Sequence, residues 1–218
     1  MSKSNKYGYT GVDIPSQAFQ ANVGKFDPSE INELVANEQW TQYGQLELIE
    51  TQNISSAVAT VDFTDIKEDI YNVHFMTWNN MEIQSNNNYI GARFSSDNGA
   101  SYESSNYQGA IKYYGIAGVY GELKGNSNTR LEFFGWGDIG DTISGYCFFY
   151  NLGDSDKYSF VTQHNSPNVE GGATGFMYFG SAVYTVESQI SGIRLFNYNT
   201  SGNFANKGNV SLYGIRYS

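Results

Sequence analysis

Residues 70–79 read IYNVHFMTWN, and this stretch decides the fold. Successive side chains of an extended chain point to opposite faces. The two faces of such a strand carry, in turn, Tyr71, Val73, Phe75 and Thr77, and Ile70, His74, Met76 and Trp78. Both faces carry bulky side chains, a pattern typical of an inner strand that is covered on both sides. We therefore expect an inner strand of a two-layer β fold.

The rest of the chain beyond residue 41 shows strand and turn signals. The sequence holds 18 Tyr, 14 Phe and 24 Gly but only 3 Pro, which favours many strands joined by Gly, Asn and Ser turns. No fixed repeat period is present, which excludes propellers, solenoids and triple-stranded fibre shafts. Irregularly spaced short strands fit an all-β, jelly-roll-like antiparallel β-sandwich, which we place at residues 41–218.

Local patterns predict individual strands and turns within this body. Alternation in 46–49 and in 57–63, around a turn at 53–56, predicts a hairpin. The Asp-Asn-Gly at 97–99 predicts a tight turn, because Asn and Gly adopt positive φ at little cost. We read residues 115–121 as a Gly-rich bend between strands.

Residues 1–40 have a different character and are predicted to be a docking arm with one short helix. Asp27 as N-cap, Pro28 at the first helical position and Glu30 three residues after the cap predict that the helix begins at Pro28. The apolar side chains of this segment are the candidate partner-docking residues: Phe26, Ile31, Leu34, Val35 and Trp40. A helix of about ten residues is unstable alone, so it must lie on the body or on a partner.

The net charge of −10 narrows the possible partners. Residues 1–26 contain Lys3, Lys6 and Lys25 against Asp13, so they carry +2 and the remainder carries −12. An acidic body argues against nucleic acid and anionic membranes as main partners. The cationic arm either docks on an acidic neighbour or merely keeps the terminus soluble.

Charged residues make up only 16% of the chain, which favours a surface of uncharged polar residues and a particle that faces the outside of a cell. No window approaches the roughly 18 apolar residues of a membrane span, so we expect no membrane insertion and no signal peptide. Cys147 is the only cysteine, which excludes an intramolecular disulfide, and its aromatic neighbours predict a buried core position.

Two loops contain closely spaced carboxylates. These are Asp138 and Asp141 in GWGDIG, and Asp154 and Asp156 in LGDSDKY. Such pairs suit a hard cation, so calcium is one reading, and capping of backbone amides is the other. The glycines of GWGDIG have the GxGxxG spacing of a dinucleotide site, but the carboxylates would repel phosphate and a strand follows, so we predict a turn.

No constellation of catalytic residues is found. His74 and His164 have no Cys or Glu at metal-binding spacing, and no nucleophile elbow is present. We expect His74 to be packed and hydrogen-bonded, and His164 to lie in an exposed loop. We therefore predict a non-enzymatic protein with no catalytic or cofactor-binding residues and no cofactor other than the calcium considered above.

Aromatic side chains beside Asn, Asp and Gln suggest glycan recognition, since flat rings stack on sugars and amides bind hydroxyl groups. The candidates are Trp78, Trp136, Tyr113, Tyr114 and Tyr184. The alternative is that these rings fill the core of the sandwich or contacts between subunits.

Several long segments resemble structural proteins of tailed phages that infect marine cyanobacteria and related ocean bacteria. They are SKSNKYGYTGVDIPSQAFQANVGKFDPSEINEL, WTQYGQLELIETQ, YNVHFMTWNN, RFSSDNGASY and the ending VSLYGIRY. In that group a β-rich body recurs on tail-fibre and other virion surface proteins. The resemblance covers nearly the whole chain and transfers no functional residues.

The resemblance implies a virion component at the particle surface, released by lysis. We expect its partners to be other virion structural proteins, bound through residues 1–40 in the tail, baseplate, fibre or capsid surface. We also expect a homo-oligomer, a trimer, because virion β modules commonly assemble about symmetry axes. The alternative is a host-attachment adhesin whose sandwich binds a host-surface carbohydrate.

Overall fold

The computed structural model describes residues 28–36, 46–116, 118–132, 135–168, 175–199 and 202–215. The chain divides into two units, residues 1–43 and residues 44–217, each of which is described by itself. The first contains helix α1 (Pro28–Ala36) and the second contains all described strands. Within the described residues, no helix has the length and apolarity to cross a membrane.

Helix α1 confirms the predicted helical segment. Ile31 and Leu34 are half-buried, whereas Asn32 and Glu33 are exposed, as the 3.6-residue period requires of an amphipathic helix. The Asp27 cap and the docking candidates Phe26 and Trp40 lie outside the described residues, as does the side chain of Val35.

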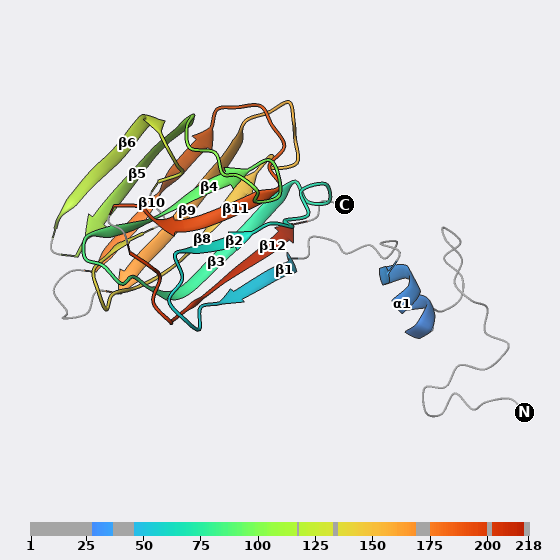
Figure 1. Ribbon diagram of the computed structural model, residues 1–218, viewed down its shortest axis with the longest axis horizontal. Helices are drawn as coiled ribbons and strands as arrows, with labels where there is room; N and C mark the ends of the chain where they lie inside the picture. The colour runs from blue at the N-terminus through green and yellow to red at the C-terminus, as the bar shows by residue number, and fades with distance from the viewer. Residues whose placement is uncertain are drawn as a thin grey trace, which may run out of the picture. The chain divides into compact units, whose positions relative to one another are not determined.

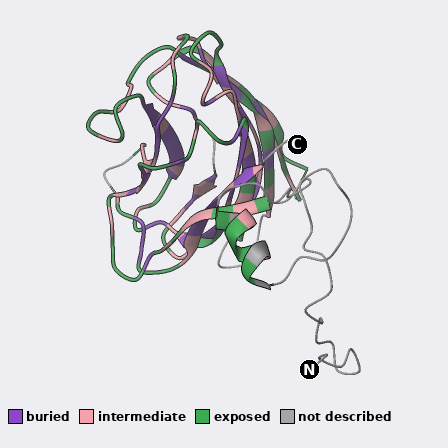
Figure 2. Ribbon diagram, turned by 90° about the vertical axis from the view of Figure 1, so that its right-hand side faces the viewer, coloured by how far each residue is buried: buried purple, intermediate pink, exposed green. Residues whose placement is uncertain are grey.

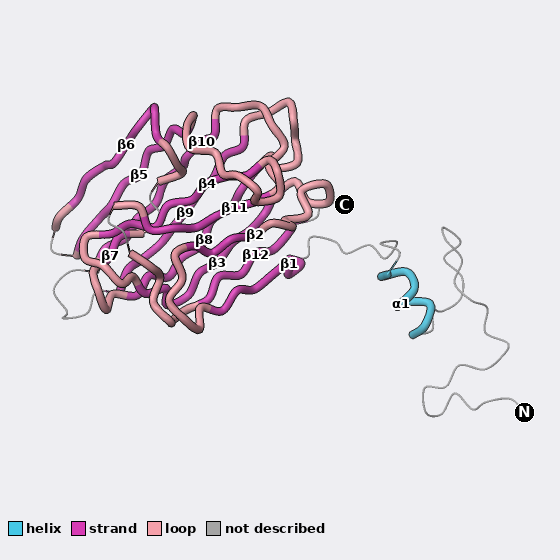
Figure 3. The backbone as a smooth tube through the Cα atoms, in the orientation of Figure 1, coloured by secondary structure: helices cyan, strands magenta, loops and turns pink. Residues whose placement is uncertain are grey.

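The second unit, which we call the body, is a two-layer antiparallel β-sandwich, as predicted. Figure 3 shows strands through most of it. The strands are β1 (Leu46–Asn53), β2 (Thr60–Phe63), β3 (Val73–Glu82), β4 (Asn88–Ser95), β5 (Tyr107–Gly115), β6 (Tyr120–Asn128), β7 (Trp136–Gly137), β8 (Thr142–Tyr150), β9 (Ser159–Asn168), β10 (Phe176–Tyr184), β11 (Gly192–Asn197) and β12 (Asn209–Ile215).

The strands form one large and one small sheet. The large sheet has eight strands in the order β1-β12-β3-β8-β9-β10-β5-β6, and the small sheet has four in the order β2-β11-β4-β7. All pairings are antiparallel. In Figure 1 the small sheet lies in front of the large one, and the two layers can be followed edge-on in Figure 2.

The predicted hairpin between 46–49 and 57–63 is wrong. β1 pairs with β12, and β2 pairs with β11 of the other sheet. Residues 54–59 cross from one layer to the other, and Ile54 N donates to Gly208 O at 3.0 Å on the way. Val61 and Phe63 are both buried, so β2 buries its apolar side by facing the large sheet instead of extending it.

The region after Gly115 also differs from the prediction. Residues 120–128 form strand β6 and pair with β5. Its sequence, YGELKGNSN, carries few apolar residues because β6 is the edge of the large sheet and most of its side chains are exposed. An edge strand needs little burial, so its apolar period is weak.

The core lies between the two sheets. Its largest fully buried side chains include Trp78, Tyr107, Phe63, Phe94 and Phe149. Cys147 is fully buried among them, as predicted, and burial raises the pKa of its thiol well above the ordinary value. Such a thiol stays protonated and packs as a small apolar group.

Strand β3 contains the stretch that predicted the fold. It is an inner strand, third in the large sheet, and His74, Met76 and Trp78 point into the core. The expectation of cover on both sides is wrong, because Phe75 and Thr77 lie half-exposed on the side of the sheet that faces away from the small sheet.

His74 is packed and hydrogen-bonded, as predicted. It is fully buried, and its Nε2 lies 2.7 Å from the carbonyl oxygen of Ile66. The edge of the Tyr71 ring lies against it at a centroid distance of 6.0 Å. Burial lowers the pKa of His74 to about 4, so the imidazole is neutral at pH 7 and Nε2–H donates to the carbonyl.

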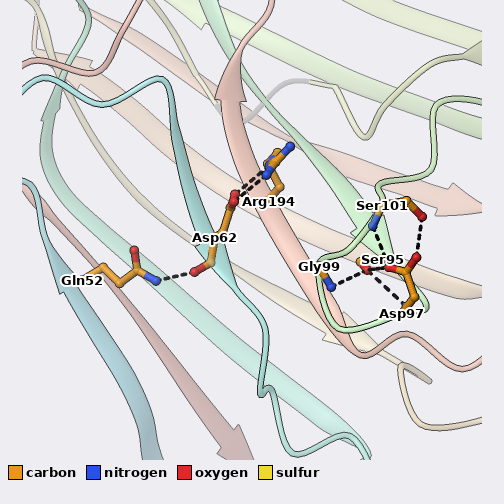
Figure 4. Close-up of polar contacts among 7 residues, drawn as sticks. All are labelled: Gln52, Asp62, Ser95, Asp97, Gly99, Ser101 and Arg194. Atoms are coloured by element: carbon orange, nitrogen blue, oxygen red, sulfur yellow. Dashed lines mark hydrogen bonds and ion pairs between the residues drawn. The ribbon is translucent and has the colours of Figure 1, made fainter.

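The Asp-Asn-Gly turn at 97–99 is confirmed and is held by the Asp97 carboxylate (Figure 4). Asn98 and Gly99 have φ values of 55° and 83°. The carboxylate accepts hydrogen bonds from Ser101 N at 2.8 Å, Ser101 Oγ at 2.6 Å and Ser95 Oγ at 2.7 Å. These bonds lower the pKa of Asp97 to about 2.

Replacing Asp97 with alanine is expected to lower the melting temperature by a few degrees at neutral pH, because the turn loses its acceptors. The folded-state pKa is depressed, so this contribution is present above about pH 3.8 and disappears as the pH falls through about 2. Melting curves of both proteins over this range check the prediction. An unchanged difference at all pH values would contradict it.

Candidate functional site

The outward side of the large sheet is the most distinctive surface of the body. We define the outer face as the outward positions of six neighbouring strands: Leu46 and Leu48 of β1; Asn209, Ser211, Tyr213 and Ile215 of β12; Val73, Phe75, Thr77 and Asn79 of β3; Ser144, Tyr146, Phe148 and Tyr150 of β8; Phe160, Thr162, His164 and Ser166 of β9; and Met177, Phe179, Ser181 and Val183 of β10.

The strand register places aromatic rings of the outer face side by side. Tyr213 is opposite Phe75, and Phe75 is opposite Phe148. The ring centroids of Phe75 and Phe148 are 4.7 Å apart, and those of Tyr150 and Phe160 are 4.6 Å apart in a stacked pair. Cross-strand aromatic pairs of this kind stabilise a sheet and leave one side of each ring in solvent.

The outer face carries no Asp, Glu, Lys or Arg at any of its defined positions. Other outward positions of the same sheet are charged: Glu82 lies at the end of β3 and pairs with Lys207 at 3.5 Å, and on β6 Lys124 forms an ion pair with Glu122 at 2.8 Å. For a chain with a net charge of −10, the absence of charge at all the defined positions of six adjacent strands is a marked segregation of charge.

The outer face is open to solvent. Leu48 is 59% exposed, Met177 47%, Tyr146 41% and Phe179 40%. Large exposed apolar areas are rare on monomeric proteins and mark interaction sites.

A shallow groove of about 450 Å³ crosses the outer face. Its lining includes Phe75, Thr77, Tyr146, His164 and Ser166. Tyr146 Oη lies 3.4 Å from Nδ1 of His164, and the two rings meet edge to face at 5.7 Å. The groove therefore offers aromatic surface, hydroxyl groups and one imidazole, which suits recognition of an uncharged partner.

His164 departs from its predicted place. It was expected in an exposed loop, but it lies within β9 and is half-buried between Tyr146 and Phe179. β9 continues past His164 to Asn168, because β8 pairs with it as far as Asn168 and β10 pairs with it as far as Asn165.

Two of the five glycan candidates are corrected by the structure. Trp78 is 1% exposed and Tyr184 is 2% exposed, so neither ring can stack on a sugar. Both occupy inward positions, Trp78 on β3 and Tyr184 on β10.

Of the other three glycan candidates, Tyr113 and Tyr114 lie on β5, next to the edge strand β6, and Trp136 lies on β7 of the small sheet. Tyr113 and Trp136 are half-buried in a second apolar cluster with Ile111 and Tyr178. Tyr114 is 49% exposed and stacks on Phe179 at 6.0 Å, next to the outer face.

The four calcium candidates are in two separate turns, and their carboxylates form hydrogen bonds within the protein. Asp141 is buried and accepts from Asp138 N at 2.9 Å, while Asp138 accepts from Asn87 N at 2.5 Å. Asp154 accepts from Asp156 N at 3.0 Å and pairs with Lys157 at 2.5 Å. Among the residues that the structure describes, no group of three or more His, Cys, Asp or Glu is placed to hold a metal ion.

The outward side of the small sheet differs strongly from the outer face. Arg194 donates to both carboxylate oxygens of Asp62 at 2.7 and 2.6 Å, as Figure 4 shows, and lies over the Tyr102 ring at 3.8 Å. Arg93 lies over Phe196 at 4.8 Å, on a neighbouring strand. This surface keeps charges that are already paired or stacked.

No family model, curated protein or solved structure matches this chain. The functional conclusion therefore depends on the geometry of the body and on the sequence patterns.

The outer face could not be recognised from the sequence. Its residues come from six segments between positions 46 and 215. The alternation within single strands, such as YCFFY at 146–150, was visible, but the shared face appears only once the strand order is known.

Proposed function

We propose that this chain is a non-enzymatic structural component of a tailed-phage virion that is attached to other virion proteins by residues 1–40 and self-associates through its body. The observation that carries the assembly role is the uncharged, aromatic outer face on an otherwise acidic chain. The virion assignment is supported by the resemblance of the segments quoted above to phage structural proteins.

The size of the outer face supports a protein contact. The outer face is about 29 Å wide, because it has six strands about 4.8 Å apart. It is about 23 Å long, because a strand of seven residues rises about 3.3 Å per residue. The outline of the face is therefore about 650 Å², and it includes polar as well as apolar side chains. Contiguous apolar patches larger than a few hundred Å² are rare on monomers.

The strand order supports a jelly-roll body, an architecture found in viral capsid proteins and lectins. In the orders β1-β12-β3-β8 and β2-β11-β4-β7, these eight strands alternate along the chain between the two sheets, except that β4 and β7 both lie in the small sheet. This alternation agrees with the two Greek keys of a jelly roll. The hairpins β5-β6 and β9-β10 extend the large sheet beyond β8.

Deleting residues 1–40 is expected to leave a folded body that no longer joins particles. The deletion removes α1 and its half-buried apolar side chains but no strand of the body. Co-purification of tagged protein with virions, together with the melting curve of the truncated chain, measures both effects. We expect at least a tenfold loss of incorporation with an unchanged melting temperature.

A matched pair of point variants tests whether α1 itself docks on the particle, because neither variant shortens the chain. Leu34→Asp places a charge on the half-buried stripe of α1, whereas Asn32→Asp places the same charge on its exposed side. Only the first should reduce incorporation. Full incorporation of the truncated chain into virions would contradict the proposed anchoring role of residues 1–40.

A host-attachment adhesin is the second candidate function, and the groove on the outer face favours it. The Phe75 and Tyr146 rings lie beside hydroxyl groups of Thr77 and Ser166 in that groove. Such surroundings suit a neutral glycan.

A further inference from the structure

We infer that the outer face is covered by the same face of a second copy of this chain, so that two bodies pair through their large sheets about a two-fold axis. The inference rests on the proposed assembly role and names its partner.

Electrostatics favours this face for self-association. Each copy carries a net charge of −10, so two copies repel at most orientations. Burying an unpaired charge in an interface is costly, and the outer face has no Asp, Glu, Lys or Arg to bury. The opposite side of the sandwich keeps Arg93, Arg194 and Asp62 in solvent contact, which makes it the poorer candidate.

The area of the outer face matches what a stable pair requires. Two faces of about 650 Å² bury about 1,300 Å² in total, within the range of specific protein interfaces. Homodimer interfaces are also rich in aromatic and apolar side chains at their centre, as are Phe75, Phe148 and Phe160 here.

A face that binds the same face of a second copy forms a closed pair. In a trimer each subunit must offer two different complementary surfaces, whereas a two-fold pair uses the same surface twice. The geometry therefore favours a pair over the trimer expected from the sequence.

The chain's own N-terminal segment is a weaker occupant. Residues 1–26 carry +2, and the outer face provides no carboxylate to attract them. A second copy needs no such attraction.

Thr162 is the position for a decisive test. It lies on β9, half-exposed, near the middle of the large sheet and opposite Phe148. Because its side chain is half-exposed, a longer charged side chain there can reach solvent in the free monomer. Thr60 of β2, half-exposed on the outward side of the small sheet, is the matched control.

The experiment is sedimentation of the full chain over a range of micromolar concentrations. We expect pairs for the natural sequence and at least a tenfold weaker association for Thr162→Lys and for Thr162→Glu, since either variant buries an unpaired charge in an uncharged interface. Both signs of charge should weaken the association, because the opposing face has no charge of either sign to pair with them. Thr60→Lys and Thr60→Glu should associate like the natural sequence.

Three results would overturn the inference. The first is a natural chain that stays monomeric. The second is association that survives both Thr162 variants but is lost when residues 1–40 are removed, which assigns the contact to that segment. The third is a monomer that binds neutral polysaccharide through Tyr146, as shown by loss of binding in Tyr146→Ala, which assigns the face to a glycan.

Failure of the proposed interface can be distinguished from failure of the proposed role in the virion. A chain that pairs in solution but never joins particles retains the interface and loses the proposed function. A chain that joins particles yet sediments as a monomer retains the role in the virion and lacks the proposed interface.

Discussion

Replacing Trp78 with alanine is expected to lower the free energy of unfolding by about 4 kcal/mol, because large aromatic side chains leave a cavity when truncated in a packed core. Trp78 is 1% exposed and packs among the core residues between the two sheets. The indole lies close to Gly145 of the neighbouring strand, where an added Cβ would be only 2.7 Å from Cζ2.

Urea denaturation of the variant measures this loss. The matched control is Tyr114→Ala, which removes a ring that is 49% exposed and should cost less than about 1 kcal/mol. In melting curves, the Trp78 variant should lose about 8–16 °C. Equal losses for the two variants would contradict the assignment of Trp78 to the core and restore it as a surface candidate.

Acidification from pH 7 to pH 4 is expected to destabilise the body by about 3 kcal/mol through His74 alone. The pKa of this side chain is lowered from 6.5 to about 4 by burial. Below pH 6.5 the unfolded chain binds a proton that the folded chain does not bind, so stability falls with pH until about 4. The loss is complete once the folded imidazole also becomes protonated.

Unfolding free energies measured at several pH values between about 4 and 7 test this expectation. His74→Gln is the informative variant, because its amide can still donate to the carbonyl of Ile66 but does not titrate. Its stability should fall much less steeply over this range. The Asp97 carboxylate, with a pKa of about 2, titrates below it and does not mask the effect. Parallel slopes for the two proteins would contradict the role of His74.

Much of the local structure of this protein was predictable from short segments. Bulky side chains on both faces of 70–79 predicted an inner strand, the Asp-Asn-Gly at 97–99 predicted a turn with positive φ, and Pro28 marked the start of α1. These features depend on backbone sterics and on neighbouring residues, which a short stretch of sequence contains in full.

Strand pairing was less predictable. β1 and β2 are neighbours in the sequence, yet they lie in different sheets, and β1 pairs with residues more than 150 positions away. An alternating pattern shows that a strand buries one side but does not identify the strand beside it. β6 escaped detection because most of its side chains are exposed and its sequence, YGELKGNSN, has almost no apolar period.

The candidate site depended on tertiary structure most of all. The sequence by itself determined which side chains share a face of each strand, such as Phe75 with Thr77 and Met76 with Trp78. Only the sandwich decided which face the small sheet covers, and it buried Trp78 and left Phe75 half-exposed. The uncharged outer face exists because non-local pairing aligns β1, β12, β3, β8, β9 and β10, a register that no single segment encodes.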